Sequence, residues 1–372
     1  NDMAFRIFRN DALRRYSDAF KLASRYTYLA ATAYDYETCL LRTENRYDSG
    51  TRFLNDIIGA RTLGRIDAGQ PVIGGGGIGE PGLADILARM QANWSVLDGR
   101  LGFNNPQSET SRFSLRTELF RIVPGSEGDT NWRQTLEQFR IDDLFTYEPF
   151  RRYCLPFAAE DGLGEHEPAI VIPFSTSINF GRNFFGHDLA GGDNAYDSSH
   201  FATKIRAVGV WFTDYDRVSD ASQALHLANQ PRVYLAPVGM DVMRTPSTGG
   251  DSLRTWRVMD QAIPLPYAVG DDVDNPDWIP LFDSLDGELA KTRRHASLRA
   301  YHDQGFDEAE MTYNSRLVGR SVWNTQWVLI IPAGTLNSDR TDALDWFING
   351  VDGTNGVTDI KLHFKTYSYE GN

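Results

Sequence analysis

The N-terminal part of the chain carries a long helical pattern of hydrophobic positions. Neither glycine nor proline occurs from residue 3 to about residue 43, and apolar or small residues recur at steps of three and four. This spacing places them on one face of a helix. The stripe consists of Phe5, Phe8, Ala12, Tyr16, Ala19, Ala23, Tyr26, Ala30, Ala33 and Leu40, and Glu37 interrupts it.

The length of this helix is informative in itself. At 1.5 Å per residue, about 40 residues span roughly 60 Å. A periodic pattern much longer than about 25 residues is typical of coiled coils and helical bundles. Because the stripe is rich in Ala and Tyr, we expect it to pack against other helices. We therefore predict that residues Phe5 to Ala33 of the stripe form an oligomerisation surface.

Two further helices are predicted before residue 100, at 51–65 and 83–99. The segment between them contains Gly74, Gly76 and Gly79, which satisfy the G-x-G-x-x-G spacing. A dinucleotide site needs a strand directly before these glycines and a helix directly after them. Only three apolar residues precede them, and Glu80 and Pro81 separate them from the helix. A flexible connector between two helices is the better interpretation.

From about residue 113 the pattern changes to short apolar runs between Gly, Pro, Asn and Asp. Residues 112–123 alternate and predict a strand, and residues 129–139 predict a short helix with Asp129 or Thr130 as its N-cap. The later runs are PAIVIPF, KIRAVGVWF, PRVYLAPVG, WVLIIPAG and VTDIKLHFKTY. Such runs are typical of an antiparallel sandwich.

These patterns together predict an α+β fold with two parts. Residues 1–112 form a long N-terminal helix plus a helical connector, which we expect to act as an oligomerisation segment. Residues 113–372 form a jelly-roll-like antiparallel β-sandwich.

Composition narrows the function classes. The 372 residues are 41% hydrophobic and 23% charged, with a formal net charge of -13. A negative charge of this size argues against nucleic acids and anionic membrane surfaces as partners. No apolar run approaches the ~18 residues of a membrane-spanning helix. Cys39 and Cys154 allow at most one disulfide and no zinc-type cysteine pair. Since the chain begins with Asn1, we expect it to be part of a longer polypeptide.

A stretch from His187 to Phe212 contains two histidines ahead of an apolar run. The second histidine, His200, lies across a glycine-containing loop, and no third ligand follows at metal spacing. A structural loop before a strand is therefore favoured over a catalytic or metal site. In that strand we expect two covered faces. One would carry Ile205, Ala207, Gly209 and Trp211, and the other Arg206, Val208, Val210 and Phe212.

Three other groups of residues leave alternatives open. Calcium prefers several carboxylates on one loop, and Asp271, Asp272, Asp274 and Asp277 offer them, although a solvated acidic loop explains them too. A hydrolase site could involve His302, Asp303 and Asp307, which fit a charged surface better. A carbohydrate-binding or adhesin-like sandwich would expose several of Trp211, Trp256, Trp278, Trp323, Trp327 and Trp346.

The sandwich part also resembles a known family. Residues 199–210, SHFATKIRAVGV, resemble a stretch near the C-terminus of the A components of bacterial toxin complexes (Tc or ABC insecticidal toxins). That stretch reads Gly-His-Tyr, one variable residue, then Arg-Arg-Ile-Lys-Ser-Val-Ser-Val. Four residues match identically and three match in kind. The identical ones are His200, Ile205, Val208 and Val210, and the similar ones are Phe201, Lys204 and Arg206.

The C-terminal end supplies a second match. TDIKLHFKTY, residues 358–367, resembles the closing Ser-Asp-Val-Ile-Leu-His-Ile-Arg-Tyr of that family, through Asp359, Leu362 and His363. The order of the segments agrees as well. AYDYE on the long helix, then GTRFLNDII, DILARMQANW and the sandwich resemble the end of an A component.

The resemblance implies a non-enzymatic role without a cofactor. In that family five copies form a shell round a helical channel, and the channel passes a toxic enzyme into a host cell. The C-terminal region docks the cocoon of the B and C components. We therefore expect a bacterial, secreted or cell-surface homo-oligomer, pentameric if the resemblance holds. Its partner would resemble the B component, and membrane contact would involve only regions outside this chain.

Overall fold

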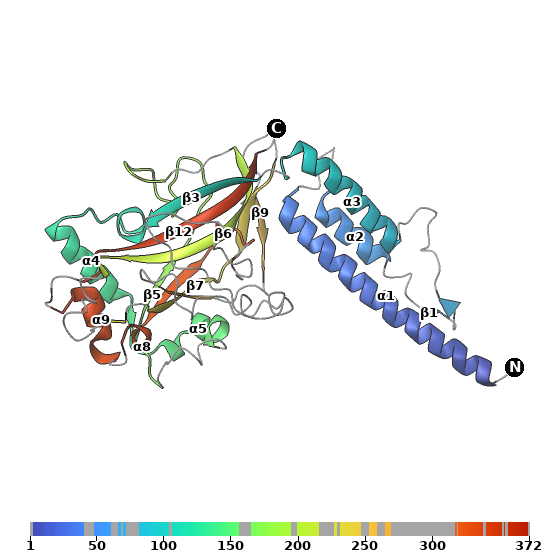
Figure 1. Cartoon of the computed structure of the whole chain (residues 1–372), viewed down its shortest axis with the longest axis horizontal. Coiled ribbons are helices and arrows are strands. Elements are labelled where there is room, and N and C mark those ends of the chain that lie inside the picture. Colours follow the sequence, from blue (N-terminus) through green and yellow to red (C-terminus); the bar gives the residue numbers. More distant parts are fainter. Residues whose placement is uncertain are drawn as a thin grey trace.

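The computed structural model has a helical arm that projects from a β-sandwich (Figure 1). The predicted α+β fold, with a long N-terminal helix and an antiparallel sandwich, is confirmed. The structure describes residues 3–40, 48–60, 66–67, 70–71, 82–103, 106–155, 165–194, 199–215, 227–228, 231–246, 253–258, 265–268, 317, 319–337, 340–351, 353 and 356–370.

The arm consists of three helices. Helix α1, Met3–Thr38, runs along the whole arm. Helices α2, Gly50–Ala60, and α3, Leu83–Arg100, lie along the half of α1 nearest the sandwich (Figure 1). Two short antiparallel strands of two residues each, β1 (Ile66–Asp67) and β2 (Gln70–Pro71), lie between α2 and α3 in the chain. Helix α1 ends at Thr38 and not near residue 43, because Cys39 adopts a left-handed conformation (φ 52°) that terminates a helix.

Close packing of α2 on α1 depends on a residue without a side chain. A Cβ added to Gly50, the first residue of α2, would lie 2.2 Å from the Cβ of Asp35. Only glycine lets the two backbones approach this closely. The pair then buries Phe53 and Ile57 of α2 together with Ile86 and Leu97 of α3.

The sandwich consists of two antiparallel sheets. The first has the order β10-β7-β11-β5-β4, and the second has the order β3-β12-β6. The bounds of the first are Leu265–Ala268, Arg232–Pro237, Trp327–Pro332, Ala169–Phe174 and Arg140–Ile141. Those of the second are Gln107–Ser114, Asp359–Glu370 and His200–Thr213. A separate pair, β8 (Asp241–Arg244) with β9 (Leu253–Trp256), lies beside the arm (Figure 1).

The main core fills the space between the two sheets. Ile172, Leu235 and Leu329 of the first sheet share one apolar cluster with Val210 and Leu362 of the second. The opposite face of the first sheet is covered by the 3-10 turn η3, Leu144–Thr146, and by helix α5, Glu148–Tyr153. Strands covered on both faces read as continuous apolar runs, which explains AIVIPF and WVLIIP.

Short helices close the end of the sandwich away from the arm. They are the π-helix η2 (Leu115–Leu119), α4 (Ser126–Gln138), α8 (Ala333–Leu336) and α9 (Arg340–Asn349). The prediction of a strand over residues 112–123 is therefore wrong after Ser114. There the Ser114 hydroxyl accepts a bond from the Thr117 N–H and starts the helical turn. Helix α4 begins after Gly125, earlier than the predicted N-caps.

The predicted arrangement of β6 needs one correction. Ala207 pairs with Lys365 and Ile205 pairs with Thr366, so Arg206 is an extra residue that forms a bulge. The bulge reverses the alternation, and Ile205 lies in the same core cluster as Val208, Val210 and Phe212. Trp211 faces the other side of the sheet, where it is half-buried beside His363.

The arm and the sandwich share an apolar cluster, here called the joint. It combines Leu40 and Phe53 of the arm with Phe201, Met243 and Tyr369 of the sandwich. The predicted boundary between residues 112 and 113 falls inside β3. Cys39 is buried in the joint, where its thiol donates to the Arg244 carbonyl, and Cys154 is buried in the cluster under α5, so the two do not form a disulfide.

Candidate functional site

Helix α1 presents three different faces along its length. Each residue turns the helix by about 100°, so the residue number gives the direction in which each side chain points around the helix axis. The face turned toward the arm's own helices contains residues that are buried or partly buried. They are Leu13, Ser17, Phe20, Ser24, Thr27, Ala31, Tyr34, Asp35 and Thr38.

The predicted stripe forms the second face, about 100° away from the first. All its residues from Phe5 to Ala33 are exposed except Ala30, which is half-buried. Phe5, Phe8 and Tyr26 expose 68%, 72% and 65% of their surface. The described helices α2 and α3 therefore do not cover the stripe, and its packing against other copies of the chain stays a prediction. Leu40, the last member of the predicted stripe, follows the end of α1 and is buried in the joint. Exposed apolar surface of this extent is typical of interaction sites.

The third face of α1 is charged. It carries Asp11, Arg14, Arg15, Asp18, Lys21 and Arg25. Asp11 and Arg15 form an exposed ion pair of 2.9 Å, and Lys21 lies 3.9 Å from Asp18. The same face also exposes the apolar side chains of Ile7, Leu22 and Leu29, so it is mixed, whereas the stripe carries only apolar and small residues.

The family-like motif residues lie at the other end of the arm, on two neighbouring strands. His200, Phe201, Lys204, Ile205, Arg206, Val208 and Val210 are on β6, and Asp359, Leu362 and His363 are on β12. Phe201 belongs to the joint, whereas Ile205, Val208, Val210 and Leu362 belong to the sandwich core. The side chain of Arg206 lies outside the described residues.

Lys204 is fully buried at the joint. Its Nζ donates to the backbone carbonyl of Glu37 at 3.0 Å and lies 3.4 Å from the Glu37 carboxylate. The rings of Tyr36, Tyr367 and Tyr369 surround the ammonium group at 5.7–5.8 Å. Burial lowers the pKa of Lys204, and the nearby carboxylate opposes that shift. The cation is thus held by the C-terminal end of α1.

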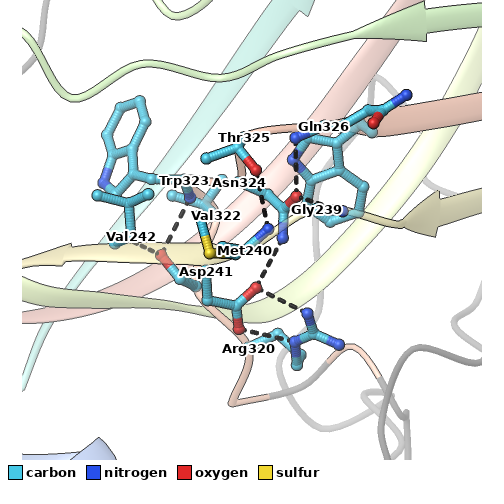
Figure 2. A network of polar contacts seen from close by, with 12 residues as sticks. Gly239, Met240, Asp241, Val242, Arg320, Val322, Trp323, Asn324, Thr325 and Gln326 are labelled. Atoms are coloured by element: carbon cyan, nitrogen blue, oxygen red, sulfur yellow. Dashed lines mark hydrogen bonds and ion pairs between the residues drawn. The ribbon is translucent and has the colours of Figure 1, made fainter. Parts of the chain in front are cut away.

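A second buried charge cluster lies next to it (Figure 2). Arg320 and Asp241 are both inaccessible to water, and two guanidinium nitrogens of Arg320 donate to the carboxylate at 2.8 and 2.7 Å. The Asn324 amide donates to the same carboxylate at 2.8 Å. The Tyr36 hydroxyl of α1 also donates to it at 2.7 Å and accepts from the Ser321 N–H. Burial, followed by Asp241, raises the pKa of Tyr36 well above its usual value.

A third ion pair joins α1 to the β8–β9 pair of strands. Arg254 of β9 donates to both oxygens of Asp35 at 2.6 and 3.0 Å, and its guanidinium lies over the Trp256 ring at 4.6 Å. Asp35 also accepts from the Thr51 N–H at the start of α2. Residues 35, 36 and 37 of α1 therefore each contact a different charged group.

The histidine pair in the predicted loop does not form a metal site. His187 is exposed on its loop, whereas His200 is partly buried with its Nε2 3.2 Å from Glu370. Throughout the described ranges, no group of three His, Cys, Asp or Glu residues could hold a metal ion. A small cavity of about 50 Å³ adjoins His200 and is also lined by Glu109, Ser111 and Thr203.

The remaining alternatives are only partly visible. Trp323 and Trp327 are buried, and Trp211, Trp256 and Trp346 are half-buried, so these five do not form an exposed aromatic platform. Trp278 lies outside the described residues. So do the glycines of the GxGxxG spacing, the aspartates of the calcium hypothesis and the residues of the hydrolase hypothesis. These are Gly74, Gly76, Gly79, Asp271, Asp272, Asp274, Asp277, His302, Asp303 and Asp307.

Sequence reasoning missed the polar contacts of the joint. Its members Tyr36, Asp241, Arg254 and Arg320 are scattered over nearly 300 residues, and nothing in their local spacing connects them. One signal was present, because Glu37 interrupts the apolar stripe near the end of α1. Glu37 is the acid to which the sandwich supplies the Lys204 cation.

Comparison with known proteins adds no further assignment. No protein-family model matches the chain, and no curated protein matches it. Within the described part of the chain, no helix combines the length and apolarity needed to cross a bilayer.

Proposed function

We propose that this chain is a non-enzymatic assembly and partner-docking region of a large secreted protein similar to the toxin-complex A components. In this proposal α1 belongs to the end of a translocation channel. The sandwich is the platform to which a protein resembling the B component docks. Any segment that enters a membrane lies outside this chain.

The observation that carries the proposal is the uncovered stripe on α1. Counting only the described residues, no side chain of α1 before Thr27 is buried. Isolated helices owe little stability to propensity, and most of it comes from packing an amphipathic face. The stripe therefore supports a role for α1 in association with another helix.

The composition of the stripe favours a second copy of the same chain as that helix. Large aromatic side chains at Phe8, Tyr16 and Tyr26 alternate with alanines such as Ala12 and Ala23. Aromatic groups of one copy can fill the spaces that the alanines of another leave, as knobs enter holes in a bundle. The surface is thus complementary to itself, which is what a homo-oligomer requires.

The joint supports the platform role of the sandwich. Two of the residues that resemble the family, Lys204 and Phe201, lie where the sandwich meets the arm, and others fill the core of the sandwich. The sandwich is therefore carried at one end of the proposed bundle, with the N-terminus of α1 at the other (Figure 1). This arrangement agrees with a docking platform at one mouth of a helical channel.

The proposal is tested by the mass of the chain in solution over a concentration series. We expect a stable multimer for the wild type, and a pentamer agrees best with the resemblance. The double variant Ala19→Asp with Ala23→Asp places two charges in the stripe at exposed positions, so the single chain can still fold. We expect it to be monomeric.

A matched control adds the same charges elsewhere on α1. Asn10→Asp with Thr32→Asp changes two exposed positions outside the stripe and should leave the multimer intact. A wild type that stays monomeric at every concentration contradicts the proposal, and so does a stripe variant with the wild-type mass. Light scattering coupled to size-exclusion chromatography provides the measurement.

A further inference from the structure

The joint contains more buried charge than adhesion between the two parts requires. The apolar cluster of Leu40, Phe53, Phe201, Met243 and Tyr369 already attaches the arm to the sandwich. Apolar contact is non-directional. Hydrogen bonds and ion pairs have strict geometry. The polar contacts at the joint therefore add direction rather than attraction.

We propose that Lys204 and Asp241 are positioning residues that fix the tilt and the rotation of α1 on the sandwich, and so determine where the stripe points. The inference deepens the proposed function and rests on it for its biological meaning. Its physical content concerns the single chain and can be measured without an oligomer.

The contact of Lys204 constrains the end of the helix. Its ammonium group reaches the last turn of α1 and bonds the carbonyl of Glu37, at the end of the helix where the dipole is negative. The Tyr369 hydroxyl holds the Glu37 carboxylate in place by donating to Oε1 at 2.8 Å. The second carboxylate oxygen remains for the cation. Side chains of strands β6 and β12 thus both bind Glu37 of α1.

The contact of Asp241 constrains a different side of the same turn. Tyr36 precedes Glu37, and consecutive helical residues point about 100° apart. The Tyr36 hydroxyl enters the Asp241–Arg320 cluster of β8 and the segment after Leu317. A helix held at two points about 100° apart on one turn can neither roll nor tilt without breaking a hydrogen bond.

The energetics of buried ions favour this role over a stabilising one. Removing a cation from water costs several kcal/mol, and a buried pair frequently does no more than offset that cost. The lowered pKa of Lys204 agrees with a burial cost that Glu37 does not fully cancel. Specific geometry is then what the buried cation contributes.

Electron–electron distance measurements test the inference. One spin label is placed at Arg25→Cys in the charged face of α1 and another at Thr110→Cys on the exposed side of β3. The native cysteines are fully buried and do not compete for the label. Dilution with unlabelled chain leaves only distances within one molecule. The unmodified joint should give one narrow distribution.

Two variants loosen the joint at different points. Lys204→Met removes the charge and keeps most of the volume, and Tyr36→Phe removes only the hydroxyl. Each should retain the circular dichroism of the wild type and broaden or shift the distance distribution. Lys361→Met is the control, because that half-buried lysine lies at the other end of β12. It should leave the distribution unchanged.

The outcomes separate this inference from the proposed function. Unchanged distributions in folded Lys204→Met and Tyr36→Phe overturn the inference, whatever the oligomeric state. If Lys204→Met does not fold, the result for Tyr36→Phe decides alone. A monomeric wild type with broadened distributions in the variants overturns the proposed function and supports the inference.

Discussion

Arg320 and Asp241 form an ion pair that is inaccessible to water. Neither has exposed surface, and the Asp241 carboxylate also receives hydrogen bonds from Asn324 and Tyr36. Removing one member of such a pair leaves an uncompensated charge in a low-dielectric environment. The pair is therefore more sensitive to a single substitution than any exposed ion pair.

We expect Arg320→Met to lower the free energy of unfolding by about 3–5 kcal/mol, as for other broken buried pairs. Urea unfolding followed by fluorescence provides the measurement. Arg15→Met is the matched control, since Arg15 pairs with Asp11 on the exposed face of α1. Its loss should cost no more than about 0.5 kcal/mol. A loss for Arg320→Met as small as the one expected for Arg15→Met would show that the buried pair is dispensable.

Asp359 predicts a pH dependence. Burial raises its pKa, and bonds from the Ser114 hydroxyl and the Arg116 N–H partly oppose the shift. The folded chain therefore holds this proton to a higher pH than the unfolded chain does. The resulting stabilisation is complete at low pH and is lost as the pH rises through the raised pKa.

Asp359→Asn cannot titrate at this position. The unfolding free energy of the wild type minus that of the variant should fall as the pH rises from the ordinary aspartate pKa, about 4, through the raised pKa of the folded chain. Parallel urea titrations at several pH values give this difference. A difference that is constant or rises with pH contradicts the assigned cause.

At the scale of elements, α2 depends on one aromatic side chain. Phe53 is fully buried, and its ring meets the Tyr34 ring of α1 edge to face at 5.4 Å. Phe53→Ala should destabilise the chain by about 3–5 kcal/mol through lost burial and the cavity left behind. Thermal unfolding measures the effect. Ile58→Ala in the same helix is the control, because Ile58 is 53% exposed. A comparable loss for Ile58 would contradict the packing described.

The sequence predicts best those helices and strands whose secondary structure depends on the hydrophobic pattern of their own residues. Five apolar runs were expected to be strands, and β5, β6, β7, β11 and β12 occupy them. Helix α1 follows equally from its period. The π-helix η2 and the β6 bulge could not be foreseen, because distant residues determine them. Asp359 accepts the Arg116 N–H from about 240 positions away along the chain, and β12 sets the register around Arg206.

At the scale of the whole molecule, the same division separates the stripe from the joint. The stripe is local, and its residues from Phe5 to Ala33 lie on one face of α1 as the period predicts, whereas Leu40 falls beyond the end of the helix. Helices α2 and α3 pack on a neighbouring face, so the predicted association of the stripe with other copies stays a prediction. The joint is assembled from residues that only the tertiary fold brings together. Its one signal in the sequence was Glu37, which interrupts the stripe.

The attachment of α1 at a single end makes the helix a lever. Its 36 residues extend about 54 Å from the point where Tyr36 and Glu37 are held, so a tilt of about 5° there displaces the far end by about 5 Å. That sideways displacement is about half of the 8–10 Å between the axes of two packed helices, enough to change which side chains the stripe would meet on the proposed partner helix. In the proposed assembly, the angle at which residues 35–37 are held would therefore decide which contacts form at the far end of the helix.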